Sequence, residues 1–229
     1  MRAQPGSRVV AVHSRSPERG AAFAERHGIP RSHDTLAALL ADDVDVVYVS
    51  TTNDRHAGEV VAAAGAGRHV LCEKPLGLAL GEARAAVDAA DRAGVVLAVN
   101  HGRRNDPAVR AAREHVRAGR IGVPLAARTA GAVLLPEHLR SWRLDEASGG
   151  GVLLDLLVHD ADVLRFVLDD PVVAVRAEAT APLPGGGEAA AGSAETVAAG
   201  VLTTAGGVIA SFLCSFSTPH GPGTLELYG

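Results

Sequence analysis

Short apolar runs alternate with amphipathic segments over the first hundred residues. Runs rich in Val and Leu are typical of buried parallel strands, and they predict strands over 8–13, 45–50, 69–72 and 95–99. Between them, helical periodicity with polar caps and closing glycines predicts helices over 16–27, 34–41, 53–65 and 80–93. We expect Asp34 to cap the second helix. This alternation predicts right-handed crossovers and a doubly wound parallel sheet.

The pattern changes after Asn100. Helices are predicted over 106–118 and 152–168, and the second of them follows the glycine triplet Gly149 to Gly151. Alternating, β-branched runs predict strands over 125–133, 172–180, 196–203 and 208–217, with a loop over 181–191. This half therefore predicts an α+β domain, in which helices cover one face of a mostly antiparallel open sheet.

Composition limits the classes of function. The chain has 229 residues, 47% of them hydrophobic, which is enough for a substantial core. A net charge of −4 without a basic face argues against nucleic-acid binding, and no apolar run reaches the roughly 20 residues that a membrane helix needs. Without a signal peptide in the sequence, we expect a cytoplasmic protein, with Cys72 and Cys214 as buried apolar side chains.

The tripeptide Glu73-Lys74-Pro75 directly follows a predicted strand. Ligands bind at the carboxyl ends of parallel strands, and Pro75 favours an extended conformation for Lys74. A lysine held there, with its pKa lowered by burial, can take part in proton transfer. The alternative is a surface lysine at a turn.

Asp155 and His159 stand four residues apart in the apolar helix predicted over 152–168. This spacing places them on one helix face, where the carboxylate can orient the imidazole and the imidazole can act as a general base. A polar pair satisfied at a domain interface is the alternative. A metal site lacks an evident third ligand, so we expect no metal. We expect Asp162 to cap or pair locally.

Ser14 and Arg15 follow the first predicted strand. An acidic residue at this place would bind both ribose hydroxyls of NAD(H), whereas Ser followed by Arg suits the 2′-phosphate of NADP(H). The cofactor is therefore expected to be NADP or NAD, with NADP favoured. No G-x-G-x-x-G turn follows any predicted strand.

Five motifs, in order, resemble the Gfo/Idh/MocA family of glucose–fructose oxidoreductase and inositol dehydrogenase. They are TTNDRH (51–56), CEKPL (72–76), NHGRRNDP (100–107), SWR (141–143) and GGGVLLDLLVHDAD (149–162). The resemblance implies a Rossmann-like nucleotide-binding domain over 1–100 and a C-terminal substrate and oligomerisation domain over 101–229. It also implies hydride transfer between a nicotinamide and a carbinol carbon of a sugar, inositol or related polyol, and a homo-oligomer formed through the C-terminal sheet.

The resemblance also implies roles for single residues. Lys74, Asp155 and His159 match the family's catalytic and substrate-binding positions, and Arg104 matches a position near the substrate. The expected cofactor contacts, besides Ser14, Arg15 and Lys74, are Thr51, Asn53, His56, Glu73, Trp142 and Arg143.

The sequence departs from the family pattern in three places. The opening strand, glycine turn and first helix are not seen, and Met1 to Gly6 is expected to be the tail of that helix. The family sheet normally continues beyond the final residues 225–229. Leu157 stands where the family usually has glycine. The missing glycine turn keeps open the alternative of a non-catalytic pseudo-enzyme or ligand sensor. A further alternative is an NAD-dependent glycoside hydrolase of the same family, which nothing in the sequence separates from a dehydrogenase.

Overall fold

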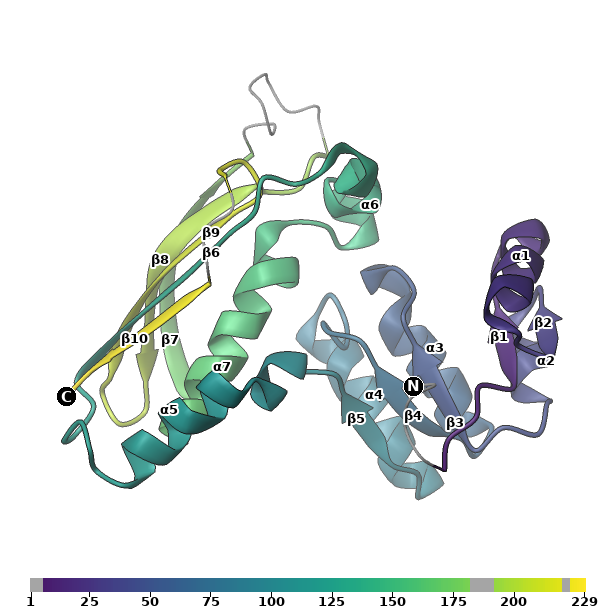
Figure 1. Cartoon of the computed structure of the whole chain (residues 1–229), viewed down its shortest axis with the longest axis horizontal. Coiled ribbons are helices and arrows are strands. Elements are labelled where there is room, and N and C mark those ends of the chain that lie inside the picture. The colour runs from purple at the N-terminus through teal and green to yellow at the C-terminus, as the bar shows by residue number, and fades with distance from the viewer. Residues whose placement is uncertain (1–5, 182–191, 220–222) are drawn as a thin grey trace. The chain divides into compact units, whose positions relative to one another are not determined.

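The computed structural model describes residues 6–181, 192–219 and 223–229 (Figure 1). The chain forms two compact units, one of residues 1–51 and 55–99 and one of residues 52–54 and 100–229. Nearly all of the predicted helix tail at Met1 to Gly6 and of the predicted loop over 181–191 lies outside the described residues.

The first unit is built from parallel strands and the helices that connect them. Its elements are β1 (Ala11–His13), α1 (Pro17–His27), β2 (Arg31–His33), α2 (Leu36–Leu40), β3 (Val46–Val49), α3 (His56–Gly65), β4 (His69–Cys72), α4 (Leu80–Ala93) and β5 (Leu97–Val99). β1 pairs with β2, and β3, β4 and β5 form a second parallel group. In the doubly wound order one more strand lies between two such groups. The predicted Rossmann-like parallel arrangement is confirmed.

Local sequence signals explain most helix ends in this unit. The Ser16 hydroxyl caps α1 by accepting a hydrogen bond from the Arg19 N–H (3.2 Å), and Gly28 ends the helix in the left-handed conformation (φ 54°). The prediction that Asp34 caps α2 is wrong. Thr35 has the extended conformation of a cap, and its hydroxyl accepts from the Ala38 N–H (3.2 Å).

The core of this unit lies on one face of the β3–β4–β5 sheet. Side chains alternate between the faces of a strand, so Val47 and Val49 point toward α3 and α4 and pack against Val60. Val46 and Tyr48 on the other face of β3 are 57% and 38% exposed. This single covered face holds the carboxyl ends of β3 and β4 in register.

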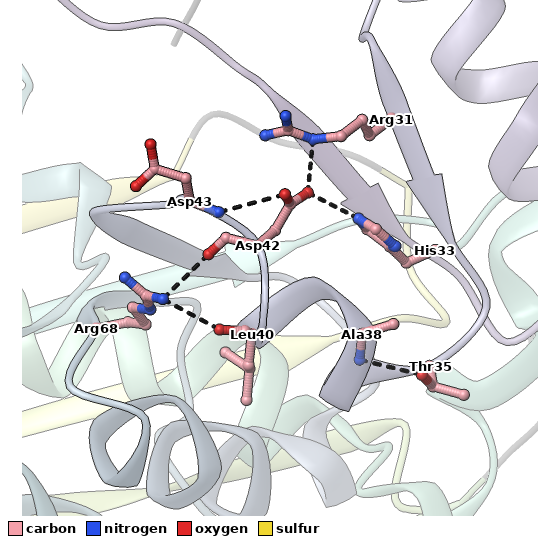
Figure 2. A network of polar contacts seen from close by, with 8 residues as sticks. All are labelled: Arg31, His33, Thr35, Ala38, Leu40, Asp42, Asp43 and Arg68. Atoms are coloured by element: carbon pink, nitrogen blue, oxygen red, sulfur yellow. Dashed lines mark hydrogen bonds and ion pairs between the residues drawn. The ribbon is translucent and has the colours of Figure 1, made fainter.

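A polar network centred on Asp42 links the two groups of strands (Figure 2). The Asp42 carboxylate accepts from Arg31 Nε (2.6 Å) and lies 2.9 Å from His33 Nε2, both on β2. Arg68, which precedes β4, donates to the carbonyl oxygens of Leu40 (3.3 Å) and Asp42 (3.0 Å). The short, polar strand β2 was not predicted, and this network anchors it.

The second unit is an open sheet with helices on one face. Its main elements are α5 (Pro107–Arg117), β6 (Ala126–Ala132), α6 (Arg140–Arg143), α7 (Val158–Leu168), β7 (Val172–Thr180), β8 (Val197–Thr204), β9 (Ile209–Ser215) and β10 (Thr224–Tyr228). The strand order of this sheet is β10-β6-β9-β8-β7. Among the described strands of this sheet, only β6 and β9 pair in parallel. α7 lies along the sheet (Figure 1), where Leu164 packs with Leu202 and Phe212. The predicted, mostly antiparallel sheet is confirmed, with β10 as an unpredicted strand.

The predicted helix over 152–168 is not a single α-helix. Leu153–Leu157 form a π-helical turn, and α7 begins only at Val158. In a π-helix the hydrogen bonds span five residues instead of four. Residues 152–158 are apolar at every position except Asp155, so their pattern could not distinguish the wider turn from an α-helical one. Asp155 lies within it.

Candidate functional site

The ends of β1 and β3 border a pocket in the first unit. Its volume is about 450 Å³, and its lining is polar and rich in cations: His13, Ser14, Arg15, Ser16, Arg19, Ser50, Thr51 and Arg55. The lining holds no carboxylate, and the N-terminus of α1 opens onto it through Ser16. A helix N-terminus with several guanidinium groups favours a phosphate. The pocket therefore offers a cationic surface that suits a phosphate group.

Glu59 on α3 organises one side of this pocket. Its buried carboxylate accepts from the Thr51 hydroxyl (2.8 Å) and pairs with Arg55 one turn earlier (2.6 Å). The Ser14 hydroxyl, for its part, accepts from the Ser16 N–H (3.3 Å), a bond that supports the turn into α1. Thr51 and Ser14 are thus held by the protein at the places where the sequence predicts cofactor contacts.

The Glu73-Lys74-Pro75 turn lies at the carboxyl end of β4, as predicted. The Glu73 N–H donates to the Val49 carbonyl (2.9 Å), and the Tyr48 hydroxyl donates to Glu73 Oε1 (2.5 Å). The Lys74–Pro75 peptide bond is cis. Lys74 is half-buried, next to the fully buried Pro75. The turn is therefore bound to the neighbouring strand β3 through both the main chain and the side chain of Glu73.

His56 supports the same turn from inside the unit. Its ring is 1% exposed, with Nδ1 2.7 Å from the Pro75 carbonyl oxygen and Nε2 3.1 Å from the Thr51 carbonyl oxygen. Both neighbours accept hydrogen bonds, so a neutral ring donates to one of them at a time. His56 was predicted to contact the cofactor. That contact stays a prediction, while the ring bridges the loop after β3 to the turn that carries Lys74.

Asp155 and His159 lie in the second unit with two more predicted residues. Arg143 Nε donates to Asp155 Oδ2 (3.2 Å), and its guanidinium stacks over the Trp142 ring at 4.5 Å from the centroid. Asp155 and His159 are both half-buried. The structure thus brings Trp142, Arg143 and Asp155 together, with His159 at the start of α7.

Arg104 makes contacts within the second unit. Its guanidinium forms a two-pronged ion pair with the buried Asp162 and lies over the Phe166 ring (5.5 Å). These hydrogen bonds raise the pKa of Arg104. Asp162 was expected to pair locally, but its partner lies 58 residues away. The role of Arg104 near the substrate stays a prediction.

Asp160, next to His159, is held in the same way. Arg103 Nη1 donates to its Oδ1 (2.5 Å), and the Cys214 thiol donates to its Oδ2 (3.7 Å). Burial raises the pKa of the Asp160 carboxyl, and it raises the pKa of the Cys72 and Cys214 thiols to about 12. Both cysteines are buried and free, as predicted.

The predicted site residues divide between the two units. Ser14, Arg15, Thr51, His56, Glu73 and Lys74 belong to the first, and Asn53, Arg104, Trp142, Arg143, Asp155 and His159 to the second. The buried Asn53 donates to the Gly149 carbonyl (2.8 Å). Sequence reasoning missed Arg19, Arg55 and Glu59. The four-residue spacing of Arg55 and Glu59 in a helical segment was the available signal.

The described residues also bear on metal binding and on membrane insertion. Residues 6–181, 192–219 and 223–229 hold no group of three or more His, Cys, Asp or Glu side chains arranged for a metal ion. Within the same ranges no helix has the length and apolar character to cross a membrane.

A parallel α/β unit with a phosphate-suited pocket, followed by an open-sheet unit with an Asp–His helix, defines the class of two-domain nucleotide-dependent oxidoreductases. Residues 1–101 match the oxidoreductase family with an NAD-binding Rossmann fold, and residues 109–229 match the GFO/IDH/MocA C-terminal domain. The chain belongs to the Gfo/Idh/MocA oxidoreductase family.

Individual relatives agree with this assignment. The 1,5-anhydro-D-fructose reductase of Ensifer adhaerens is 49% identical over 227 residues, 98% of this chain and 66% of that protein. D-xylose 1-dehydrogenase (NADP(+)) 2 of Haloferax volcanii is 36% identical over 163 residues, 71% of this chain and 50% of that protein. GenD2 from gentamicin A biosynthesis, in complex with NAD, superposes with a TM-score of 0.90 at 32% identity, covering 100% of this chain and 64% of that one. The chain therefore spans about half to two thirds of the length of these relatives.

Proposed function

We propose that the protein is an oxidoreductase that transfers a hydride between a nicotinamide cofactor and a carbinol carbon of a sugar or related polyol. The observation that carries the proposal is that one chain combines both domains of the family with the predicted residues Lys74, Asp155 and His159. Lys74 follows β4. Asp155 lies in the π-helical turn before α7, and His159 lies in the first turn of α7, the helix that covers the second sheet. The proposal requires that the two units bring Lys74 and His159 to the same substrate.

The residues of the chain supply binding and proton transfer, while the nicotinamide, when bound, supplies the hydride chemistry. In the oxidising direction His159 accepts the hydroxyl proton of the carbon that loses hydride, and in the reducing direction it returns that proton to the new alkoxide oxygen. Lys74 donates a hydrogen bond to the same oxygen and stabilises its developing charge.

Asp155 and Arg143 form a polar surface suited to an uncharged polyol. Arg143 Nε pairs with Asp155 Oδ2 at 3.2 Å, and a carboxylate and a guanidinium are groups that accept from and donate to sugar hydroxyls. Trp142, on which Arg143 stacks, offers an apolar ring for the C–H face of a sugar. The names of two relatives, a 1,5-anhydro-D-fructose reductase and a levoglucosan dehydrogenase seen with NADH and levoglucosan, support cyclic sugar derivatives as the substrate class.

NADP(H) is the proposed preference among the nicotinamide cofactors. Ser14 and Arg15 were predicted to favour it, and the pocket adds Arg19 and Arg55 without a lining carboxylate. A 2′-phosphate carries negative charge that guanidinium groups in this pocket would pair with, whereas a ribose 2′-hydroxyl carries none. Arg55 already pairs with Glu59 (2.6 Å), so the preference rests mainly on Arg15 and Arg19.

Assembly through the sheet of the second unit belongs to the same proposal. The face of the sheet away from the Phe212 core exposes Val201 (38%), Leu213 (44%) and Ile209 (56%). Burying apolar side chains against a second copy of the chain stabilises a dimer in proportion to the area covered. We propose a homo-oligomer formed by this face.

The test measures NADPH oxidation with a panel of sugars that includes 1,5-anhydro-D-fructose. We expect Lys74→Ala and His159→Ala each to lower kcat/KM by about 10²- to 10⁴-fold, because each removes a proton-transfer or charge-stabilising group. Glu114→Ala, a change at an exposed position of α5, serves as the control. Full activity in both site variants would refute the roles given to Lys74 and His159. Tight sugar binding without turnover by the unaltered protein would favour a sensor.

A further inference from the structure

The first residues of the π-helical turn that carries Asp155 are hydrogen-bonded to Glu195, a residue far along the chain. The Val152 N–H donates to the Glu195 carbonyl oxygen (3.0 Å), and the Leu153 N–H donates to Glu195 Oε1 (2.9 Å). The first N–H groups of a helix have no acceptor within the helix. A carboxylate at that end also interacts favourably with the positive end of the helix dipole. Glu195 therefore caps this turn with both its main chain and its side chain.

The glycine triplet makes room for this cap. Gly151 has φ +101°, and a Cβ there would collide with the Glu195 carboxylate. A Cβ at Gly150 would lie 2.6 Å from the Arg143 carbonyl oxygen. The approach of Glu195 and of Arg143 to the turn thus requires glycine at both positions.

Pairing with the segment around Leu144 fixes Glu195. The Ala194 N–H donates to the Leu144 carbonyl (3.0 Å), and the Glu146 N–H donates to the Gly192 carbonyl (3.1 Å). Glu195 leads directly into β8, through the buried Thr196. The cap therefore belongs to the sheet, so it holds the turn to a rigid part of the unit.

The same contacts reach Asp155. The Asp155 N–H donates to the Gly151 carbonyl (3.0 Å), and the Gly151 N–H donates to the Arg143 carbonyl (2.9 Å). The Arg143 side chain then returns to Asp155 through its Nε (3.2 Å). Shifting the start of the turn would move the carboxylate relative to its guanidinium partner.

We propose that Glu195 is a positioning residue, which sets Asp155 and the following His159 for reaction by fixing the start of the π-helical turn. The inference rests on the proposed function of Asp155 and His159. In this role Glu195 acts through Asp155 and His159 and not on the substrate itself. Misplacing a reacting group by about 1 Å can lower a rate by about 100-fold, so a cap at this point acts on catalysis as well as on stability.

The test compares Glu195→Ala, Glu195→Gln and the control Glu114→Ala, an exposed glutamate of α5 in the same unit. We expect Glu195→Ala to lower kcat by about 10- to 100-fold with an unchanged KM for the nicotinamide cofactor. Glu195→Gln keeps an acceptor oxygen and is expected to stay within about threefold of the unaltered protein. The thermal unfolding curve of each variant gives its folded fraction at the assay temperature, and the loss of kcat per total protein is compared with the loss of that fraction.

Two outcomes overturn the inference. One is an unaltered kcat in Glu195→Ala. The other is a loss of kcat in Glu195→Ala that equals its loss of folded protein, because a cap that only stabilises the fold lowers both together. Asp155→Asn and His159→Ala are measured alongside. If these two keep full activity, the proposed function fails; if they lose activity and Glu195→Ala does not, only the positioning role fails.

Discussion

Three guanidinium groups line the pocket of the first unit at the ends of β1 and β3. Arg15 precedes the cap of α1, Arg19 stands in its first turn, and Arg55 reaches the same pocket from the segment after β3. Three cations and a helix N-terminus within one pocket are groups that favour a phosphate, and they support the proposed preference for NADP(H). Sequence reasoning found the first of them because it directly follows a strand, and it missed the other two because their approach depends on the fold.

Arg19→Ala tests the cofactor preference. Removing one charge-assisted hydrogen bond of about 1.5–3 kcal/mol predicts a roughly 10- to 100-fold weaker Kd for NADPH, with little change for NADH. Arg26→Ala, at the other end of α1, is the matched control and is expected to leave both affinities unaltered. Titration followed by nicotinamide fluorescence measures these constants. Equal losses for the two cofactors, or tighter binding of NADH by the unaltered protein, would contradict an NADP(H) pocket.

Helices and strands differ in how much of them the sequence predicts. The predicted bounds of β4, α4 and β7 agree with the structure, because glycine ends and apolar runs mark them directly. β2 is short and polar, and β10 follows a segment without alternating pattern, so neither was predicted. The π-helical turn at Asp155 was missed since hydrophobic periodicity does not report how far its hydrogen bonds reach. Pairs such as Arg104–Asp162 join residues 58 positions apart, which no local pattern encodes.

The network that anchors β2 predicts a pH dependence of stability. The hydrogen bond with His33, together with Arg31, holds the pKa of Asp42 below its usual value. A carboxyl with a lowered folded pKa stabilises the fold above its unfolded pKa of about 3.9, and that contribution is lost as the pH falls through the folded value. Asp42→Asn should therefore unfold at lower temperature than the unaltered protein at pH 7, and the difference should shrink below about pH 4.

Asp43→Asn is the control for this prediction, because the neighbouring Asp43 is exposed and contributes only its main-chain N–H to the network. Thermal unfolding of both variants is followed at a series of pH values. A difference between Asp42→Asn and the unaltered protein that is constant from pH 7 to pH 3 would show that the Asp42 charge does not act on stability.

At the scale of the whole molecule, two units divide the proposed reaction between them. The first contributes the nucleotide pocket and Lys74, and the second contributes Asp155, His159 and the sheet proposed to join copies of the chain. The order of the motifs along the sequence predicted domains over 1–100 and 101–229, whereas Asn53 belongs to the second unit. The side chains that hold the predicted residues in place could be identified only from the fold. His56 supports the turn that carries Lys74, and Glu195 caps the turn that carries Asp155.

Leu213→Glu tests assembly through the sheet. Placing a charge in an apolar interface leaves it desolvated and unpaired, so the variant is expected to elute as a smaller species. Val123→Glu, at a site 76% exposed in the same unit before β6, is the control. Light scattering after size exclusion gives the masses. An unaltered mass for Leu213→Glu, or a monomeric unaltered protein, would exclude this face as the interface.

The central claim, hydride transfer to a sugar carbon assisted by His159, is tested most directly with NADPH carrying deuterium at the reactive nicotinamide position. Mass spectrometry of the polyol formed from 1,5-anhydro-D-fructose is predicted to show one deuterium bound to carbon with the unaltered protein. His159→Ala is predicted to form that product at a rate lower by about 10²- to 10⁴-fold. A product without deuterium, or the same labelled product at the same rate from His159→Ala, would contradict the account.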